Sequence, residues 1–227
     1  MTSIAQRYED VGGRISAAAA SSGRRYSDIT LVAVAKTFPA AAVNEVLEAG
    51  ATDVGENRVQ ELTAKAELVS APVTWHFVGH LQTNKVRDVV GLVALVHSVD
   101  RSSVAAEIAK RARAAGIRQR VLVEVNIASE ETKHGLTPSH LRPFVEEMAK
   151  LEGIEVCGLM AIPPLSESPE GSRPHFDALR VLRDEIAETV PTVRELSMGM
   201  SRDLEVAVEE GATIVRVGEA IFGSRSR

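Results

Sequence analysis

The sequence lacks the features of several large classes of protein. A single cysteine, Cys157, occurs among 227 residues, so no disulfide can form within the chain, and a reducing compartment is indicated. No apolar run approaches the roughly 20 residues of a membrane-spanning helix. The charged start MTSIAQRYED has no apolar stretch of the kind that secretory signals contain.

The chain also lacks a strong excess of charge of one sign. Its formal net charge is −5, with acidic and basic residues mixed along the sequence, which argues against a surface for nucleic acid or for an anionic membrane. We therefore expect a cytoplasmic protein with no nucleic-acid or membrane partner. Aromatic residues are scarce at 4%, whereas apolar residues make up 44%, so the core must be aliphatic. No linker, internal repeat or change of composition divides the sequence, and we expect one domain over residues 1–227.

Short apolar runs alternate with helical patterns along the chain. The expected strands are residues 30–35, 51–55, 74–79, 94–99, 120–127, 155–162, 193–199 and 212–217. These runs are apolar on both faces, which is typical of a parallel sheet covered by helices, and many helical patterns end on glycine. About eight alternations predict an α/β fold of the (β/α)8 TIM-barrel type. A doubly wound open sheet is the alternative, but no G-x-G-x-x-G or Walker A loop supports it.

Two segments need a separate interpretation. The apolar spacing predicts an extra N-terminal helix over residues 4–20, weakened at Gly12-Gly13, while only GEAIFGSRSR follows the last strand. We expect the N-terminal helix to cover the gap that this short segment leaves. Residues 163–174 are rich in proline, serine and glycine and are expected to form a long loop.

Polar residues follow the expected strands at the end where a barrel of this type carries its site. Lys36 follows the first apolar run, at a depth where a lysine without a partner is costly. Ser201 and Gly218 follow the last two strands, in strand–turn–helix patterns whose free N–H groups are typical of a phosphate site. Ser201 is also the expected N-cap of the helix that follows it.

Other polar residues have structural interpretations. Arg216 lies within the last strand and needs a buried acceptor, for which Glu195 and Glu124 are candidates. Cys157 has no evident base beside it and is expected to be a small core residue. The six histidines show no metal-ligand spacing, so we expect no metal site.

A lysine amine and a phosphate site at one end of a barrel suggest a ligand that carries an aldehyde and a phosphate, because a lysine amine forms a Schiff base with a carbonyl group. From the residues alone, three interpretations stay open. The first is pyridoxal 5'-phosphate (PLP) held by Lys36. The second is a Schiff-base aldolase acting on a sugar phosphate, and the third is a binding protein without chemistry of its own.

Several long motifs narrow this choice. AVAKTFP, VGENRVQEL, WHFVGHLQTNK, VNIASEETKHG, GLMAIPP and LSMGMSRDLEVAVEEGATIVRVGEAIFG, in this order, closely resemble the pyridoxal phosphate homeostasis protein family (YggS/PROSC type). The resemblance implies a fold-type III barrel similar to the N-terminal domain of alanine racemase. It also implies that Lys36 carries PLP as a Schiff base and that Ser201 and Gly218 hold the phosphate. The remaining implied pocket residues are Arg216 near the pyridine nitrogen, Asn57, Met200 and, close by, His76.

The same resemblance raises the question of enzyme or carrier. A racemase of this fold needs two bases, a lysine and a tyrosine, and in alanine racemase the tyrosine comes from a further C-terminal domain. Here the sequence ends at Arg227, and its only tyrosines, Tyr8 and Tyr26, precede the first strand. We expect a monomeric PLP homeostasis protein that buffers PLP or delivers it to apo-enzymes without efficient catalysis. A racemase-like, PLP-dependent enzyme is the alternative. Lys133 and His134 form either a second anion site or a solvated loop.

Overall fold

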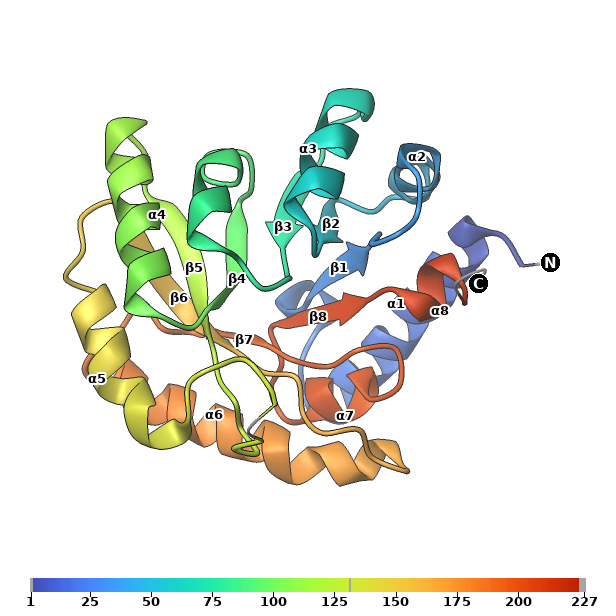
Figure 1. Cartoon of the computed structure of the whole chain (residues 1–227). Coiled ribbons are helices and arrows are strands. Elements are labelled where there is room, and N and C mark those ends of the chain that lie inside the picture. Colours follow the sequence, from blue (N-terminus) through green and yellow to red (C-terminus); the bar gives the residue numbers. More distant parts are fainter. Residues whose placement is uncertain (1, 131, 225–227) are drawn as a thin grey trace.

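The strands form a closed parallel barrel (Figure 1). The structure is a computed structural model that describes residues 2–130 and 132–224, so Glu131 of the motif EETKHG and the terminal Arg227 lie outside the described residues. Its strands are β1 (Thr30–Val34), β2 (Asp53–Glu56), β3 (Thr74–Phe77), β4 (Leu95–Val99), β5 (Gln119–Glu124), β6 (Ile154–Met160), β7 (Glu195–Ser197) and β8 (Ile214–Val217). Each strand pairs with the next, and β8 pairs with β1 to close the barrel. The predicted TIM barrel is confirmed, and the open-sheet alternative is wrong.

Helices connect the strands and surround the barrel (Figure 1). They are α1 (Ile4–Ser21), α2 (Ala40–Glu48), α3 (Val59–Leu68), α4 (Ser102–Ala114), α5 (Pro138–Met148), α6 (Arg173–Ala187), α7 (Leu204–Glu209) and α8 (Glu219–Phe222). Short 3-10 helices add η1 (Tyr26–Asp28), η2 (Thr83–Asp88) and η3 (Pro169–Ser172). The connection from β3 to β4 holds η2 in place of the α-helix that a complete repeat would have.

The N-terminal helix α1 takes the place of a full eighth helix. It runs without a break through Gly12-Gly13, because the burial of Val11 and Ile15 outweighs the conformational cost of two glycines. Helix α8 has only four residues, and α1 lies beside α7 and α8 (Figure 1). The expected cover for this gap is therefore confirmed.

Two arginines of α1 attach it to the end of the barrel sequence. The Arg7 Nε donates to the carbonyl oxygen of Ile221 at 2.6 Å. The Arg14 Nε lies 2.6 Å from Glu205 Oε1. The Nη2 of Arg14 donates to the carbonyl oxygen of Ser201 at 3.0 Å. Helix α1 thereby holds the backbone of a residue that the sequence places in the candidate site.

The expected loop over residues 163–174 is only partly correct, because η3 begins at Pro169 and α6 begins at Arg173. Pro169 and Pro174 both occupy first-turn positions of their helices. A first-turn N–H has no partner within a helix, so a proline there loses no hydrogen bond. These prolines begin helices instead of prolonging the loop.

The barrel interior is filled from alternate positions of the strands. Val32 and Val34 of β1 belong to the inner cluster, whereas Leu31 and Ala33 pack with the helix layer, as the two-residue period of a strand requires. The inner cluster is apolar and consists of Val32, Val34, Leu95, Leu122, Cys157, Met160 and Ile214. Cys157 is thus the core residue that was expected, 3% exposed.

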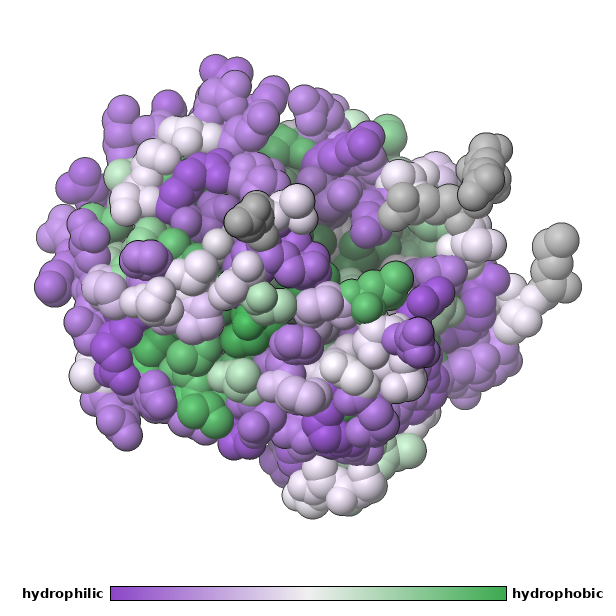
Figure 2. Space-filling model, turned by 60° about the horizontal axis from the view of Figure 1, so that its bottom comes forward, coloured by the Kyte–Doolittle hydropathy of each residue, from purple (hydrophilic) through white to green (hydrophobic). Residues whose placement is uncertain are grey.

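The outer surface is mainly hydrophilic on the face that Figure 2 shows, with hydrophobic side chains gathered in small separate areas. Ile162, Leu165 and Met200 are exposed apolar side chains in the connections after β6 and β7. Among the described helices, none is long and apolar enough to cross a membrane.

Candidate functional site

The C-terminal mouth of the barrel, meaning the end where the strands finish, contains Lys36. Lys36 lies two residues beyond Val34, so strand alternation carries its side chain to the inner side of this mouth. The residue is half-buried rather than sealed in the core. The next residue, Thr37, has a positive φ of 70°, a conformation that is costly for a β-branched residue and persists only where its surroundings hold it.

Two charged side chains of α3 hold the backbone on both sides of Lys36. The Lys65 Nζ donates to the carbonyl oxygen of Ala35 at 2.8 Å. The Glu61 Oε2 accepts a hydrogen bond from the Thr37 N–H at 2.7 Å. Lys65 and Glu61 lie one helical turn apart, with Nζ and Oε2 separated by 3.4 Å. This pair therefore fixes the position of Lys36 and supports the strained Thr37.

Lys65 also forms a buried ion pair with Glu56, the last residue of β2, at 2.5 Å between Nζ and Oε1. Glu56 is 0% exposed and Lys65 is 6% exposed. Burial raises the pKa of Glu56, although the hydrogen bond and charge of Lys65 oppose that shift. Neither charge is tolerable at this depth without the other.

Lys65 is not among the site residues expected from the sequence, because a lysine in the helical pattern NRVQELTAKAELV is typical of a solvated helix face. A signal was nevertheless present. Glu56 stands at the end of a buried strand, where an unpaired carboxylate is costly, and the spacing of Glu61 and Lys65 places them on one side of the helix that follows.

Asn57 lies beside Lys36 at the mouth. The strand register pairs Val34 with Gly55. Lys36 lies two residues after Val34, and Asn57 lies two residues after Gly55, so the two residues are neighbours. The Asn57 Oδ1 is buried and has no hydrogen-bond partner among the described residues. A Cβ on Gly79 would lie 2.1 Å from the Asn57 carbonyl oxygen, so only glycine permits the backbone to pass there. Asn57 therefore offers an unfilled polar atom next to Lys36.

Ser201 and Gly218 come together although they follow different strands. The Ala220 N–H donates to the Ser201 Oγ at 3.1 Å, which joins the loop after β7 to the start of α8. A Cβ on Gly218 would lie 3.0 Å from the Val34 carbonyl oxygen. Glycine thus lets the start of α8 approach β1 close to Lys36, and the two predicted phosphate residues share the mouth with the lysine.

The expectation that Ser201 caps the next helix is wrong, because α7 begins at Leu204 and its N-cap is Asp203. The Met200 N–H donates to Asp203 Oδ1 at 2.7 Å, and Gly199 has a positive φ of 87°. With this turn the helix starts two residues later than expected, and the Ser201 hydroxyl is left to accept a hydrogen bond from the N–H of Ala220 in α8. Met200, a predicted pocket residue, is 37% exposed at the mouth.

Arg216 is buried in the barrel interior, 5% exposed. Its Nη1 donates to Ser197 Oγ at 2.5 Å, and its Nη2 donates to the carbonyl oxygen of Ala161 at 3.1 Å. Because Ala161 directly follows β6, the guanidinium reaches toward the C-terminal mouth. Among the described residues Arg216 makes no ion pair with Glu195 or Glu124, so that structural alternative is wrong. Burial lowers the pKa of Arg216 to about 10.

Glu124, at the end of β5, is one of two carboxyl groups whose charge raises the pKa of Arg216 from a distance, and Asp203 is the other. Burial raises the pKa of Glu124 to about 7, the charge of Asp100 adds to that shift, and Arg216 opposes it. A carboxyl group that is half protonated near neutral pH therefore lies just below the mouth.

His76 lies deeper than the other predicted residues, as the third residue of β3 and 4% exposed. Its Nε2 is 2.8 Å from Asp53 Oδ1, and its Nδ1 is 2.9 Å from His97 Nε2. The structure therefore places His76 inside the barrel, apart from the residues at the mouth: Lys36, Asn57, Met200, Ser201 and Gly218.

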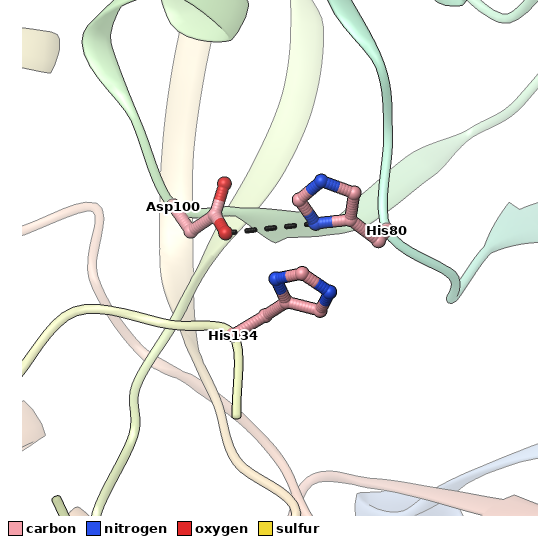
Figure 3. A group of neighbouring side chains, drawn as sticks. All are labelled: His80, Asp100 and His134. Carbon is pink, nitrogen blue, oxygen red and sulfur yellow. Dashed lines mark ion pairs between the residues drawn. The ribbon is translucent and has the colours of Figure 1, made fainter. Parts of the chain in front are cut away.

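A second polar group lies where the loops after β3, β4 and β5 meet (Figure 3). The rings of His80 and His134 stack with their centroids 3.9 Å apart, and His80 Nδ1 lies 3.6 Å from Asp100 Oδ2. These three groups are close enough to hold a metal ion. The Arg101 Nη1, however, lies 2.9 Å from His80 Nε2 and can only donate, so the His80 proton belongs on Nδ1. That nitrogen then has no lone pair for a metal.

Sequence spacing could not reveal this group, because its members come from three separate loops. Lys133, which was expected to form a second anion site with His134 or a solvated loop, pairs with Glu130. The charge of Lys133 is therefore already balanced, and His134 is occupied by its stack on His80.

Comparison with known proteins agrees with this geometry. A family model for the alanine racemase N-terminal domain matches residues 17–226. The pyridoxal phosphate homeostasis protein of Aquifex aeolicus is 47% identical over 97% of this chain and 97% of its own. The chain belongs to the pyridoxal phosphate homeostasis protein family. The Pseudomonas aeruginosa protein of the same name is 41% identical over 99% of this chain and 97% of its own.

Solved structures extend the comparison within the family and beyond it. PipY of Synechococcus elongatus with PLP bound is 37% identical with a TM-score of 0.80, covering 92% of this chain and 100% of PipY. Alanine racemase of Clostridium difficile is 18% identical with a TM-score of 0.71, covering 88% of this chain and 53% of the racemase. That second likeness shows the fold alone. The predicted family and its alanine-racemase-like barrel are confirmed.

Replacing Lys65 by methionine should destabilise the protein by about 3–5 kcal/mol, because Glu56 would then be a buried charge without a partner. The free energy of unfolding in urea measures this. Adding Glu56→Gln should recover part of the loss by removing that charge. Lys110→Met, at a lysine that is 68% exposed and paired with Glu107, is the matched control and should change stability by less than about 1 kcal/mol. A double variant no more stable than Lys65→Met would contradict this account.

Replacing Glu124 by glutamine should change how stability depends on pH. The folded pKa of about 7 lies above the ordinary value, so the folded state holds a proton that the unfolded state releases, and stability falls as pH rises from about 4.5 to 7. Glu124→Gln should remove that fall, leaving the variant roughly 2–3 kcal/mol more stable than the parent at pH 8 and similar at pH 5. Urea unfolding of the PLP-free protein measures it. Glu152→Gln, at a side chain that is 85% exposed, should leave the profile unchanged, and parallel profiles for parent and Glu124→Gln would refute the expectation.

Proposed function

We propose that this chain binds PLP at the C-terminal mouth of its barrel and holds it covalently on Lys36. The Lys36 amine would attack the PLP aldehyde, forming a carbon–nitrogen double bond and releasing one water molecule. The observation that carries the proposal is the support of the backbone on both sides of Lys36 by Lys65 and Glu61, at a mouth that also contains Ser201 and Gly218. PLP binding by the relative PipY supports it.

The residues at this mouth suit the groups of the cofactor. The Ser201 hydroxyl and the backbone at Gly218 would hold the phosphate, and Asn57, with its unfilled Oδ1, and Met200 would line the pocket. Arg216 would lie near the pyridine nitrogen, where a fixed cation disfavours protonation of the ring. When bound, PLP supplies an electron-withdrawing ring, and the charge of Arg216 restrains that chemistry.

We further propose that the protein is a carrier that buffers PLP and delivers it to apo-enzymes, as a cytoplasmic monomer of one domain. Both tyrosines lie toward the opposite mouth, where the strands begin: Tyr26 is in η1 just before β1, and Tyr8 interacts with Asp53, the first residue of β2. Burial raises the pKa of Tyr8 to about 12, so it is not a base at neutral pH. The described residues place no tyrosine opposite Lys36 as a second base, and with one base racemisation would be inefficient.

Borohydride reduction of the PLP-loaded protein should fix the cofactor on Lys36. The loaded protein should be yellow, and peptide mass mapping should place the reduced label on that residue. Lys36→Ala should lose both the colour and the label, whereas Lys150→Ala, at an exposed lysine of the α5–β6 connection, should keep them. A label on another lysine, or an unchanged absorption spectrum in Lys36→Ala, would overturn the assignment.

Incubating the loaded protein with each L-amino acid in heavy water separates carrier from enzyme. We expect no D-amino acid and little deuterium at the α-carbon, because one base reaches only one face of the substrate. Transfer of PLP to a PLP-dependent apo-enzyme, followed by recovery of that enzyme's activity, should occur in parallel. Racemisation at about 1 s⁻¹ or faster, the range of ordinary enzymes, would instead establish the racemase-like alternative.

A further inference from the structure

Five polar side chains form a continuous hydrogen-bonded chain through the barrel interior. In order they are Asp53 of β2, His76 of β3, His97 of β4, Ser197 of β7 and Arg216 of β8. The four links measure 2.8, 2.9, 2.8 and 2.5 Å between heavy atoms. Four of these residues are at most 5% exposed, and only the Asp53 side chain, 20% exposed, reaches the mouth where the strands begin.

The chemistry of the two ends is consistent with one direction for all four hydrogen bonds. Arg216 can only donate, so the Ser197 Oγ accepts from it, and the Ser197 hydroxyl proton is available to His97 Nδ1. His97 then carries its proton on Nε2 and donates to His76 Nδ1. His76 in turn donates from Nε2 to the carboxylate of Asp53. All four bonds then point the same way.

The charges along this chain agree with that direction. Burial lowers the pKa of His97 far below its ordinary value, and electrostatic interaction with His76 and then with Arg216 adds to the effect. Burial alone would raise the pKa of Asp53, but the hydrogen bonds from His76 and Thr52 outweigh it and lower that pKa. Arg216 therefore stands at one end of this hydrogen-bonded series, and Asp53, with its lowered pKa, stands at the other.

We propose that Asp53, His76, His97 and Ser197 are positioning residues for Arg216, which hold its guanidinium toward the cofactor ring through this one-way chain of hydrogen bonds. The inference rests on the proposed function, since it assigns the orientation of Arg216 to a bound PLP. The Ala161 carbonyl holds the other Nη of Arg216, so the guanidinium plane is set by two acceptors. His76 thereby acts on the cofactor through three intervening side chains and not by contact.

The carboxylate at the end of this hydrogen-bonded series gives it a role beyond satisfying buried polar groups. Any buried hydrogen bond to Ser197 would satisfy its hydroxyl, but a chain that ends in a carboxylate polarises each donor toward Asp53 and makes Ser197 a stronger acceptor for Arg216. The fixed cation near the ring would lower the pH at which the PLP imine gains its proton. Loosening Arg216 should therefore raise that pH.

The first arm of the test uses the PLP-free protein. Nitrogen-15 NMR of the histidine rings at pH 7 should show His76 and His97 as neutral rings with the proton on Nε2. A proton on Nδ1 of either ring, or a cationic ring, would overturn the proposal whether or not the protein binds PLP.

The second arm follows the absorption of bound PLP against pH. Ser197→Ala should raise the midpoint of the spectral change by about one pH unit, whereas Ser197→Thr keeps the hydroxyl and should stay close to the parent. Ser98→Ala is the matched control, because Ser98 is a buried serine of β4, 1% exposed, that bonds the Gly79 carbonyl outside the chain. A midpoint that moves equally in Ser98→Ala, or that does not move in Ser197→Ala, would overturn the proposal. Failure of the parent protein to take up PLP would instead reject the proposed function, and with it the role of this hydrogen-bonded series in orienting Arg216 toward the cofactor.

Discussion

A single buried ammonium group, that of Lys65, connects the three parts of the molecule that meet at Lys36. It bonds the end of β1 through the Ala35 carbonyl, the end of β2 through Glu56, and its own helix through Glu61. A hydrophobic side chain could fill the same space, but it could not hold a carbonyl oxygen and balance a carboxylate at once. The position of Lys36, which directly follows Ala35, therefore depends on the ion pair of Lys65 with Glu56, which lies outside the pocket.

Much of the fold follows from local patterns, because strands buried on both faces stand out as apolar runs and the helices between them end on glycine. The errors arise where neighbouring residues compete for one role. Ser201 and Asp203 are both suitable N-cap residues. The turn at Gly199, whose positive φ cannot be predicted from the sequence pattern, places Asp203 at the start of α7. Pro169 and Pro174 suit a loop as well as a first helical turn, and the packing of α6 selects the turn.

Some residues of the candidate site could likewise be predicted from local patterns, and others could not. Lys36 and Gly218 could be identified because a polar or flexible residue at the end of a buried strand is conspicuous. Lys65 left a weaker signal, in the buried Glu56 and in the spacing from Glu61. The hydrogen-bonded series from Asp53 to Arg216 could not be identified, because it depends on which side of five strands faces inward and on how far each strand is shifted against the next. That shift accumulates around a closed barrel, so His97 and Ser197, 100 residues apart in sequence, become hydrogen-bonded neighbours.

The attachment of α1 to the far end of the chain bears on how the protein is made. Arg7 and Ile221 are separated by 214 residues, and Arg14 and Ser201 by 187, so these contacts close the longest loops in the molecule and carry the largest entropy cost. During synthesis α1 and β1 leave the ribosome long before α7, β8 and α8, against which they pack and pair. Lys36 and Gly218 directly follow β1 and β8, the two strands that close the barrel, so the mouth they share can be assembled only once the chain has been made through β8.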